Sequence, residues 1–252
     1  MALTGPDLDH LAIGVRSIDE AVRLAARGAG GGPGQVFVEP SWRGVQVAFA
    51  AGIRLEALEP IHDPRDDFLT RFIEHSGEGP HHATFKVPDI AARLDRLRGL
   101  GIEPVKVDLS DPNWKEAFLH PRLGLGTVVQ LAQPSGQWSG DPPRTDEAEG
   151  VSGEFLGAEL HGDLEQAARV FGGVLEGAAR EVDGGVAYSW PGGGSLVVRP
   201  VEEGAKPRVE RFVFRVRRWP SDRGPLTREA PLYAGPATLL RLHADEDWPV
   251  GR

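Results

Sequence analysis

Two histidines, one glutamate and one glutamine occupy matched places in a duplicated sequence. His10 and His82 are 72 positions apart, and each is followed by a similar pattern of apolar residues. Glu56 and Gln130 are 74 positions apart and lie in similar segments. The first half of the chain therefore contains two copies of one unit. Each copy has a histidine on its first expected strand and a Glu or Gln on its last.

Together these four side chains offer two imidazole nitrogens, one carboxylate and one amide oxygen. Such a set suits a divalent first-row ion, with zinc, cobalt, nickel, manganese or iron all possible. A metal held in this way can polarise a carbonyl and stabilise an enolate formed next to it. Taken alone, each residue is more simply explained as a core or solvated polar side chain. The joint pattern favours a metal site over a polar pocket without metal.

The elements that must position these residues are repeated with them. In the second copy, residues 83–87 alternate in hydropathy as a strand does, Asp89 can cap a helix, and Gly101 ends that helix. In the first copy a strand over residues 8–15 precedes a helix over residues 17–27. Three short strands are expected after each helix, at 35–39, 44–50 and 53–58 in the first copy and at 104–107, 115–120 and 126–132 in the second.

These patterns predict an α+β fold of tandem βαβββ modules, which form a cupped half-barrel with the four matched residues inside. The glycine-rich stretch 28–34 is expected to be a loop, because it follows a helix and does not begin one. Residues 66–75 are expected to form a short connecting helix between the two copies.

Three aromatic residues are expected to line an apolar cup for a small molecule, namely Trp42, Phe49 and Trp114. His81 precedes His82 directly, and neighbours on a strand point to opposite faces. We therefore expect His81 to point away from the cup.

The second half of the chain is predicted to be a degenerate copy of the first. Residues 136–150 are rich in Gly, Pro and acidic residues, which is typical of a linker between domains over 1–135 and 151–252. Weaker third and fourth units follow, and the fourth lacks its helix. Strands are expected at 155–160, 174–180, 186–190, 195–199, 208–216 and 237–243, with a helix at 163–171. Alignment places Leu156, Leu196, Arg211 and Arg241 at the four matched positions, so this domain is predicted to lack metal ligands.

The composition excludes several classes of protein. The 252 residues carry a formal net charge of −9 and include no cysteine, which excludes disulfides, thiolate metal sites and a cysteine nucleophile. The acidic balance argues against nucleic-acid binding, and the lack of a long apolar run argues against a membrane span. The beginning of the chain has no signal-peptide pattern, which predicts a cytoplasmic protein. We expect a small-molecule substrate, and either a monomer with domains paired within the chain or a homodimer.

Four segments carry a resemblance to a known family: DHLAIGV (9–15), EALEP (56–60), GEGPHHATFKVPDI (77–90) and FLHPRLGLGTVVQL (118–131). They resemble the vicinal-oxygen-chelate superfamily, which includes glyoxalase I, extradiol dioxygenases, fosfomycin- and bleomycin-resistance proteins and methylmalonyl-CoA epimerase. The order of the segments is most similar to the epimerase. The resemblance covers residues 8–134, and the second half resembles the superfamily only in its expected fold.

The resemblance implies metal ligands at His10, Glu56, His82 and Gln130. It implies a metal-dependent isomerase or lyase that acts on a small oxygenated substrate through an enolate-like intermediate, with Glu56 as both ligand and base. Two positions depart from the epimerase pattern, because Gln130 replaces a usual glutamate and the stretch around Trp42 lacks a glutamate proposed as a base. The alternatives are a non-catalytic, resistance-type binding protein and an extradiol-type dioxygenase.

Overall fold

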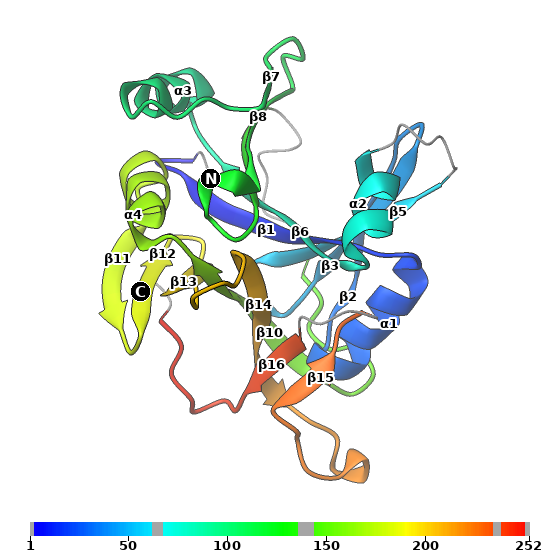
Figure 1. Ribbon diagram of the computed structural model, residues 1–252. Helices are drawn as coiled ribbons and strands as arrows, with labels where there is room; N and C mark the ends of the chain where they lie inside the picture. The colour runs from blue at the N-terminus through cyan, green and yellow to red at the C-terminus, as the bar shows by residue number, and fades with distance from the viewer. Residues whose placement is uncertain (1–2, 62–67, 136–143, 234–237, 250–252) are drawn as a thin grey trace.

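The computed structural model describes residues 3–61, 68–135, 144–233 and 238–249. These residues form two sheets of eight strands each, with a few short helices packed around them (Figure 1). The predicted α+β class is confirmed. Parts of the expected connecting helix (66–67), linker (136–143) and last strand (237) lie outside the described residues.

The first sheet consists of the two repeated units joined side by side. Its strands are β1 (Asp7–Gly14), β2 (Gly32–Val38), β3 (Trp42–Ala48), β5 (Arg54–Pro60), β6 (Gly79–Lys86), β7 (Lys106–Asp108), β8 (Trp114–Leu119) and β9 (Val128–Pro134). They lie in the order β2-β3-β5-β1-β6-β9-β8-β7. The first strands of the two copies, β1 and β6, pair antiparallel at the centre. Each also pairs parallel with the last strand of its own copy, β5 or β9.

The second sheet repeats this arrangement. Its strands are β10 (Ser152–Gly162), β11 (Ala178–Val182), β12 (Gly185–Ser189), β13 (Ser195–Pro200), β14 (Arg208–Arg218), β15 (Glu229–Pro231) and β16 (Thr238–Leu242). Again the two central strands, β10 and β14, are antiparallel, and each has a parallel outer neighbour, β13 or β16. The eighth strand, β4 (Ala51–Gly52), comes from the first half of the chain and pairs with β10.

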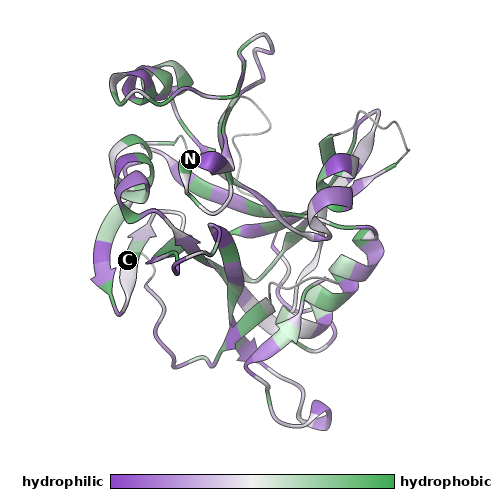
Figure 2. Cartoon of the chain, in the orientation of Figure 1, coloured by the Kyte–Doolittle hydropathy of each residue, from purple (hydrophilic) through white to green (hydrophobic). Residues whose placement is uncertain are grey.

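Two long helices follow the first strands of the repeat, as the sequence predicts. In α1 (Ile18–Ala29) the Ser17 hydroxyl accepts a hydrogen bond from the Glu20 amide, and in α3 (Ile90–Gly99) Asp89 caps the first turn in the same way. Figure 2 shows polar and apolar residues alternating along α1, as expected for a helix with one buried side. The remaining helical segments are α2 (Phe68–Ser76), α4 (Leu164–Ala167), the π-helix η3 (Ala168–Val174) and the 3₁₀ turns η1 (Pro121–Leu123) and η4 (Ser221–Arg223). Between β14 and β15 the chain forms only η4, so the fourth unit lacks its helix.

The glycine-rich stretch 28–34 differs from the predicted loop. It contains the end of α1, a left-handed cap at Gly30 and the beginning of β2 at Gly32. Gly30 has φ +74°, and a Cβ atom there would lie 2.4 Å from the backbone oxygen of Val151. Close packing between the two halves therefore requires glycine at this position.

One continuous core joins the two modules. Phe85 of β6 packs edge-on against Trp190 of the second module, with ring centroids 4.8 Å apart. The same cluster of buried apolar side chains includes residues of β1, β5, β6 and β9 together with residues of β10, β13 and β14. The modules therefore share a core rather than each burying its own.

The strand registers correct three of the four matched positions in the second module. Leu11 pairs with Leu55 in the first sheet, and Ala158 pairs with Leu196 in the second, with all four side chains in the shared core. Ala158 therefore corresponds to Leu11, and the counterpart of His10 is Gly157 rather than Leu156. Since Leu196 corresponds to Leu55, the counterpart of Glu56 is its neighbour Val197.

The comparison of strand registers also changes the residue that corresponds to Gln130. In the first sheet Leu11 pairs with Ala83, and its neighbour Ala12 pairs with His82. In the second sheet Ala158 pairs with Phe212, so Phe212 corresponds to Ala83. Arg211, which precedes Phe212, therefore remains the counterpart of His82. In the first sheet Thr84 pairs with Gln130. In the second sheet the counterpart of Thr84 is Val213, which pairs with Leu240. Leu240 rather than Arg241 is therefore the counterpart of Gln130. The alignment was shifted because β-bulges and unequal loops change the offset between copies.

The first sheet curves around a cavity of about 700 Å³. Side chains from all eight of its strands line this cavity, including the two edge strands β2 and β7. The face that the sequence predicts to carry the four matched residues is therefore concave.

Candidate metal centre

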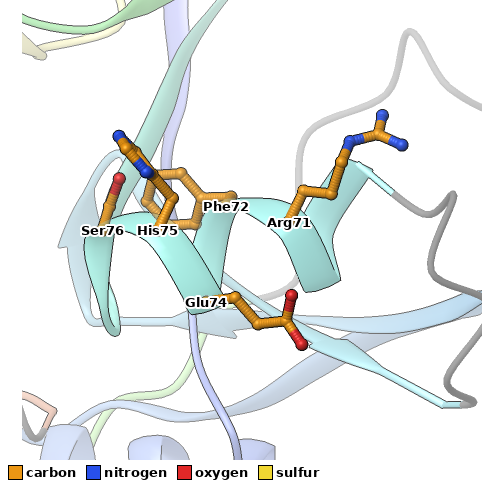
Figure 3. A pocket seen from close by; sticks show the side chains of 5 residues that line it. All are labelled: Arg71, Phe72, Glu74, His75 and Ser76. Carbon is orange, nitrogen blue, oxygen red and sulfur yellow. The ribbon is translucent and has the colours of Figure 1, made fainter.

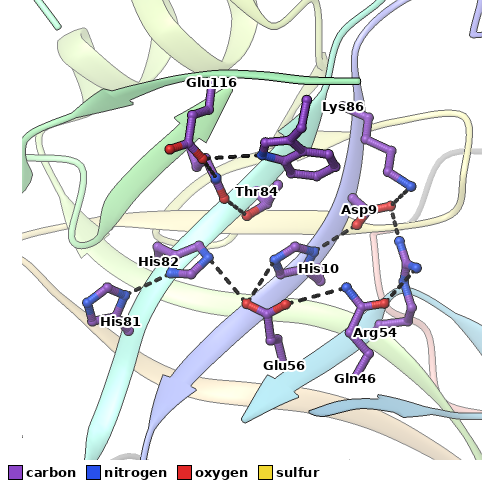
Figure 4. A network of polar contacts seen from close by, with 12 residues as sticks. Asp9, His10, Gln46, Arg54, Glu56, His81, His82, Thr84, Lys86 and Glu116 are labelled. Carbon is purple, nitrogen blue, oxygen red and sulfur yellow. Dashed lines mark hydrogen bonds and ion pairs between the residues drawn. The ribbon is translucent and has the colours of Figure 1, made fainter. Parts of the chain in front are cut away.

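Two histidines and one glutamate meet at the bottom of this cavity. His10 comes from β1, Glu56 from β5 and His82 from β6, so three adjacent strands contribute one residue each. Oε2 of Glu56 lies 3.4 Å from Nε2 of His10 and 3.6 Å from Nε2 of His82 (Figure 4). The ligand atoms of the three residues all lie within 4.8 Å of one another. They are the one group of this kind among the described residues.

A buried carboxylate fixes the orientation of His10. Nδ1 of His10 donates a hydrogen bond of 2.7 Å to Oδ2 of Asp9. The other oxygen of Asp9 forms ion pairs with Arg54 and with Lys86, whose Nζ is 2.9 Å away. Because Nδ1 is the donor to Asp9, Nε2 of His10 is the nitrogen that faces Glu56 and the cavity.

The electrostatics of the site favour charge on His10 and Glu56. Burial alone would lower the pKa of His10, but the carboxylates of Glu56 and Asp9 outweigh it and raise the pKa to about 9. Burial would likewise raise the pKa of Glu56, and the opposing effect of His10 lowers it to about 2. Without a metal, the proton carried by His10 therefore provides a positive charge beside the carboxylate of Glu56.

His82 is held by the neighbouring histidine. Burial, followed by repulsion from His81, lowers the pKa of His82 well below its ordinary value, so its imidazole is neutral. The Nδ1 atoms of His81 and His82 are 2.8 Å apart, and His81 also lines the cavity. The prediction that His81 points away is wrong. The register of β1 with β6 skips His81, which makes it the extra residue of a bulge, and strand alternation does not hold there.

Gln130 lines the same cavity but has two protein partners. Its side-chain oxygen accepts a hydrogen bond of 2.6 Å from the Thr84 hydroxyl, and its amide nitrogen donates one of 2.9 Å to Glu116. Glu116 also accepts a hydrogen bond from Trp114 and pairs with Lys106. The amide group of Gln130 is therefore held in place at the cavity wall, and the second lone pair of its oxygen can bind a ligand.

The residues present fit a divalent cation. Nε2 of His10 is buried and forms no hydrogen bond, although the Glu56 oxygen lies 3.4 Å away. A buried nitrogen that forms no hydrogen bond is costly unless something binds it. Many metal sites use two neutral imidazoles and one carboxylate as ligands, as His10, His82 and Glu56 would provide. In many of them a further carboxylate accepts a hydrogen bond from one of the histidines, as Asp9 does from His10.

The structure places the three predicted aromatic residues in two different locations. Trp42 of β3 and Trp114 of β8 line the cavity. Phe49 does not: it is fully buried between the modules, with its ring 5.8 Å from that of Phe155 and 5.1 Å from that of Phe214. Phe49 follows the end of β3, where the chain leaves the cavity and approaches the second sheet, so it is a core residue.

A second hollow of about 670 Å³ lies beside α2 (Figure 3). Its five lining residues belong to this one helix, and Glu74 projects away from Arg71 and His75 in the view shown. It brings together no cluster of metal-ligating side chains from the described chain. The cavity of the first sheet is therefore the candidate functional site.

Sequence reasoning missed Asp9, Gln46, Arg54, Lys86 and Glu116. Glu116 could have been found, because it alternates with Trp114 and Phe118 on a predicted strand that lies beside the strand of Gln130. Gln46, whose amide lies 3.5 Å from Glu56, is likewise on the strand that pairs with Glu56. Arg54 and Lys86 carry no sequence signal, because only the fold brings them to Asp9.

Comparisons with known proteins agree with this architecture. The sequence model of the Glyoxalase/Bleomycin resistance protein/Dioxygenase superfamily matches residues 9–118. An ethylmalonyl-CoA/methylmalonyl-CoA epimerase from Cereibacter sphaeroides is 29% identical over 133 residues, which are 50% of this chain and 96% of the relative.

Similar solved structures include a synthase and an epimerase. A triple mutant of 4-hydroxymandelate synthase from Streptomyces coelicolor is similar with a TM-score of 0.58 and 17% identity, over 85% of this chain and 72% of that one. Methylmalonyl-CoA epimerase from Mycobacterium tuberculosis has a TM-score of 0.47 and 21% identity, over 55% of this chain and 95% of its own. The first likeness extends across both modules and shows a shared fold.

Among the described residues, no helix is long and apolar enough to cross a membrane. The chain thus has a two-module glyoxalase-like fold, and its predicted resemblance is confirmed by the match of residues 9–118 to the Glyoxalase/Bleomycin resistance protein/Dioxygenase superfamily.

Proposed function

We propose that this protein is a metal-dependent isomerase or lyase that removes a proton next to a carbonyl group of a small oxygenated substrate. The observation that carries the proposal is the meeting of His10, Glu56 and His82 at the bottom of one cavity, with Nε2 of His10 buried and without a hydrogen bond. The relative named as an ethylmalonyl-CoA/methylmalonyl-CoA epimerase supports proton transfer as the type of reaction.

His10, Glu56 and His82 would hold the ion, with the side-chain oxygen of Gln130 as a fourth ligand. A bound zinc, cobalt, nickel, manganese or iron(II) ion would supply positive charge that stabilises negative charge on a substrate oxygen. Asp9 keeps His10 in the tautomer that presents Nε2, and Arg54 and Lys86 keep Asp9 ionised.

Two carboxylates are available for proton transfer. Glu56 on β5 and Glu116 on β8 approach the cavity from opposite sides of the central pair β1 and β6. Removal of a proton from one face of a carbon and its return on the other is simplest with two such groups. Glu116 therefore supplies a second acid–base group in a chain that lacks the usual carboxylates at Trp42 and Gln130.

Metal analysis and isotope exchange test this proposal. Protein purified without chelator or immobilised nickel should contain close to one first-row ion per chain, and less than about 0.2 would contradict a metal site. In D₂O, the loaded protein should incorporate deuterium next to the carbonyl of a 2-oxo acid or a thioester from a test panel. Glu56→Gln should abolish the exchange, whereas Glu20→Gln, on the exposed face of α1, should retain it.

A resistance-type binding protein makes the opposite prediction. It would bind its ligand and fold normally without metal, and it would exchange no deuterium in either variant.

One observation also favours a second candidate, an iron-dependent oxygenase. The three groups that lie closest together are two histidines and one carboxylate, the set used by many non-haem iron(II) oxygenases. Oxygen consumption that requires iron(II) and a phenolic or 2-oxo substrate, with no deuterium exchange, would support this candidate instead.

We further propose a cytoplasmic enzyme with a metal-bearing domain over 1–135 and a metal-free domain over 151–252. The corrected positions Gly157, Val197 and Leu240 support a metal-free second domain, because none of them offers a side-chain ligand for a metal ion.

A further inference from the structure

We propose that the cavity of the first sheet takes a small substrate that has an aromatic ring and little negative charge, rather than a coenzyme A ester. This substrate class rests on the proposed function, because the metal-binding residues form the floor of the same cavity. Three features carry the inference: the layering of the cavity, the position of its aromatic side chains and the pairing of its charges.

The cavity is layered from polar floor to aromatic wall to charged rim. The floor residues His10, Glu56 and His82 are buried. The aromatic side chains of the lining are half-buried, except for that of Phe68, which is 43% exposed. The charged side chains of Glu39, Lys106 and Asp111 are exposed at the mouth. A ligand that reaches the floor with its oxygen atoms must therefore place its next atoms between aromatic rings.

The aromatic side chains form two walls, one at each side of the curved sheet. Trp42 lies edge-on to Phe68, with ring centroids 6.5 Å apart, and Phe68 lies 5.4 Å from the ring of His81. Trp114 and Phe118 come from β8, at the other side of the curved sheet. Phe37 of β2 completes the first wall. Because aromatic rings pack well in offset or edge-to-face contacts, such walls favour a flat ring between them.

The charges of the described lining disfavour a polyanion. Five acidic side chains line the cavity against three basic ones, Arg54, Lys86 and Lys106. Each basic group already has a carboxylate partner: Arg54 and Lys86 pair with Asp9, and Lys106 pairs with Glu116. A ligand with several phosphate groups would need basic groups that are not already paired.

The size of the cavity agrees with this class. About 700 Å³ is within the range of pockets that enclose small molecules. A ring with a short oxygenated side chain can reach the floor and still be covered by both walls.

Calorimetric titration with three probes tests the inference. Phenylpyruvate and pyruvate share the 2-oxo acid group and differ by one aromatic ring. Propionyl-CoA has no aromatic ring on its acyl group and contains the polyanionic coenzyme A. On the cobalt-loaded protein we expect phenylpyruvate to bind at least about tenfold tighter than pyruvate, as burial of a ring would give. Propionyl-CoA should bind more weakly than phenylpyruvate.

Substitutions in the aromatic walls test whether these side chains cause the preference for phenylpyruvate over pyruvate. Trp42→Leu and Trp114→Leu should each reduce the ratio of phenylpyruvate to pyruvate affinity at least about threefold. Trp42→Phe should retain it, because a ring remains. Trp219→Leu is the matched control, since this half-buried tryptophan lies in the second module against Arg241. If one wall variant does not fold, the other carries the test.

An affinity ratio close to one, or tightest binding of propionyl-CoA, would overturn the inference while leaving the metal site intact. If cobalt does not bind, the proposed function fails. The ratio measured on the metal-free protein, together with the wall variants, then decides the substrate class alone.

Discussion

Asp9 is the residue whose charge organises the candidate metal centre, because it contacts His10, Arg54 and Lys86 at once. Asp9→Asn keeps the size of the side chain and removes its charge. We expect the variant to bind Zn²⁺ about 10–100-fold more weakly, the usual cost of losing an outer-shell partner of a metal-binding histidine. Competition with a chromophoric chelator measures this change.

The matched control for that substitution is Asp7→Asn. Asp7 lies two positions earlier on β1 and accepts a hydrogen bond from the backbone of Gly192 in the second module. Its substitution should leave Zn²⁺ affinity unchanged. An equal loss of affinity in both variants would show that Asp9 acts through general stability and not through His10.

The protonation of His10 predicts a pH dependence of metal binding. In the metal-free protein the pKa of His10 is about 9, so a proton must leave Nε2 before a metal can bind at neutral pH. Zn²⁺ affinity should therefore rise about tenfold per pH unit up to pH 9 and then level off. Chelator competition at several pH values tests this; an affinity that is flat between pH 7 and 9 would contradict it.

Stability of the metal-free protein should change in the opposite direction over the same range. The folded-state pKa of His10 lies above its ordinary value of 6.5. The stabilisation from charged His10 is therefore complete below pH 6.5 and is lost as the pH rises through about 9. Urea unfolding of the metal-free protein should show this decline, and a saturating metal should remove it.

At the scale of elements, the two-residue strand β4 joins the first module to the second sheet. The amide of Ile53 donates a hydrogen bond of 2.9 Å to the backbone oxygen of Phe155. Gly52 has φ +83°, and a Cβ atom there would lie 2.0 Å from that same oxygen. The pairing of β4 with β10 therefore depends on the absence of a side chain at this position.

We expect Gly52→Ala to destabilise the protein by about 1–3 kcal/mol more than Gly77→Ala does. Gly77 has a similar φ of +77°, but a Cβ atom there would have no neighbour within 4 Å, so its substitution reports backbone strain alone. Urea unfolding of both variants gives the difference. Equal losses would mean that the contact of β4 with β10 contributes nothing to stability.

At the scale of the whole molecule, the shared core predicts one cooperative unfolding transition. Metal bound in the first module should then stabilise both modules together, by about 2.7 kcal/mol at a free concentration 100 times the dissociation constant. Fluorescence and far-UV circular dichroism should report the same midpoint with and without metal. Two separate transitions, with only one shifted by metal, would contradict a single core.

The pairing of the modules also predicts a monomer. The second module covers Phe85 of β6 and Phe49, which follows β3, and both side chains are fully buried within one chain. Light scattering should give a mass near 27.2 kDa. A stable dimer would show that a further surface takes part in assembly.

Much of this arrangement could be predicted from local patterns. Strand alternation, the caps at Ser17 and Asp89, and the repeat spacing identified the units, because each depends on residues near one another in sequence. The repeat also predicted that His10, Glu56 and His82 share a face. It did not predict His81, since a bulge of one residue reverses the direction of a side chain without changing the hydropathy pattern.

The sequence by itself determined the α+β class, the duplicated unit and the residue types of a candidate metal centre. Only the tertiary structure decided that Asp9 pairs with Arg54 and Lys86, that Glu116 joins Gln130, and that Phe49 packs between modules rather than in the cavity. The reason is physical. Periodicity fixes the face on which a side chain lies, but the curvature of the sheet and the bulges in its strands determine which side chains meet across that face.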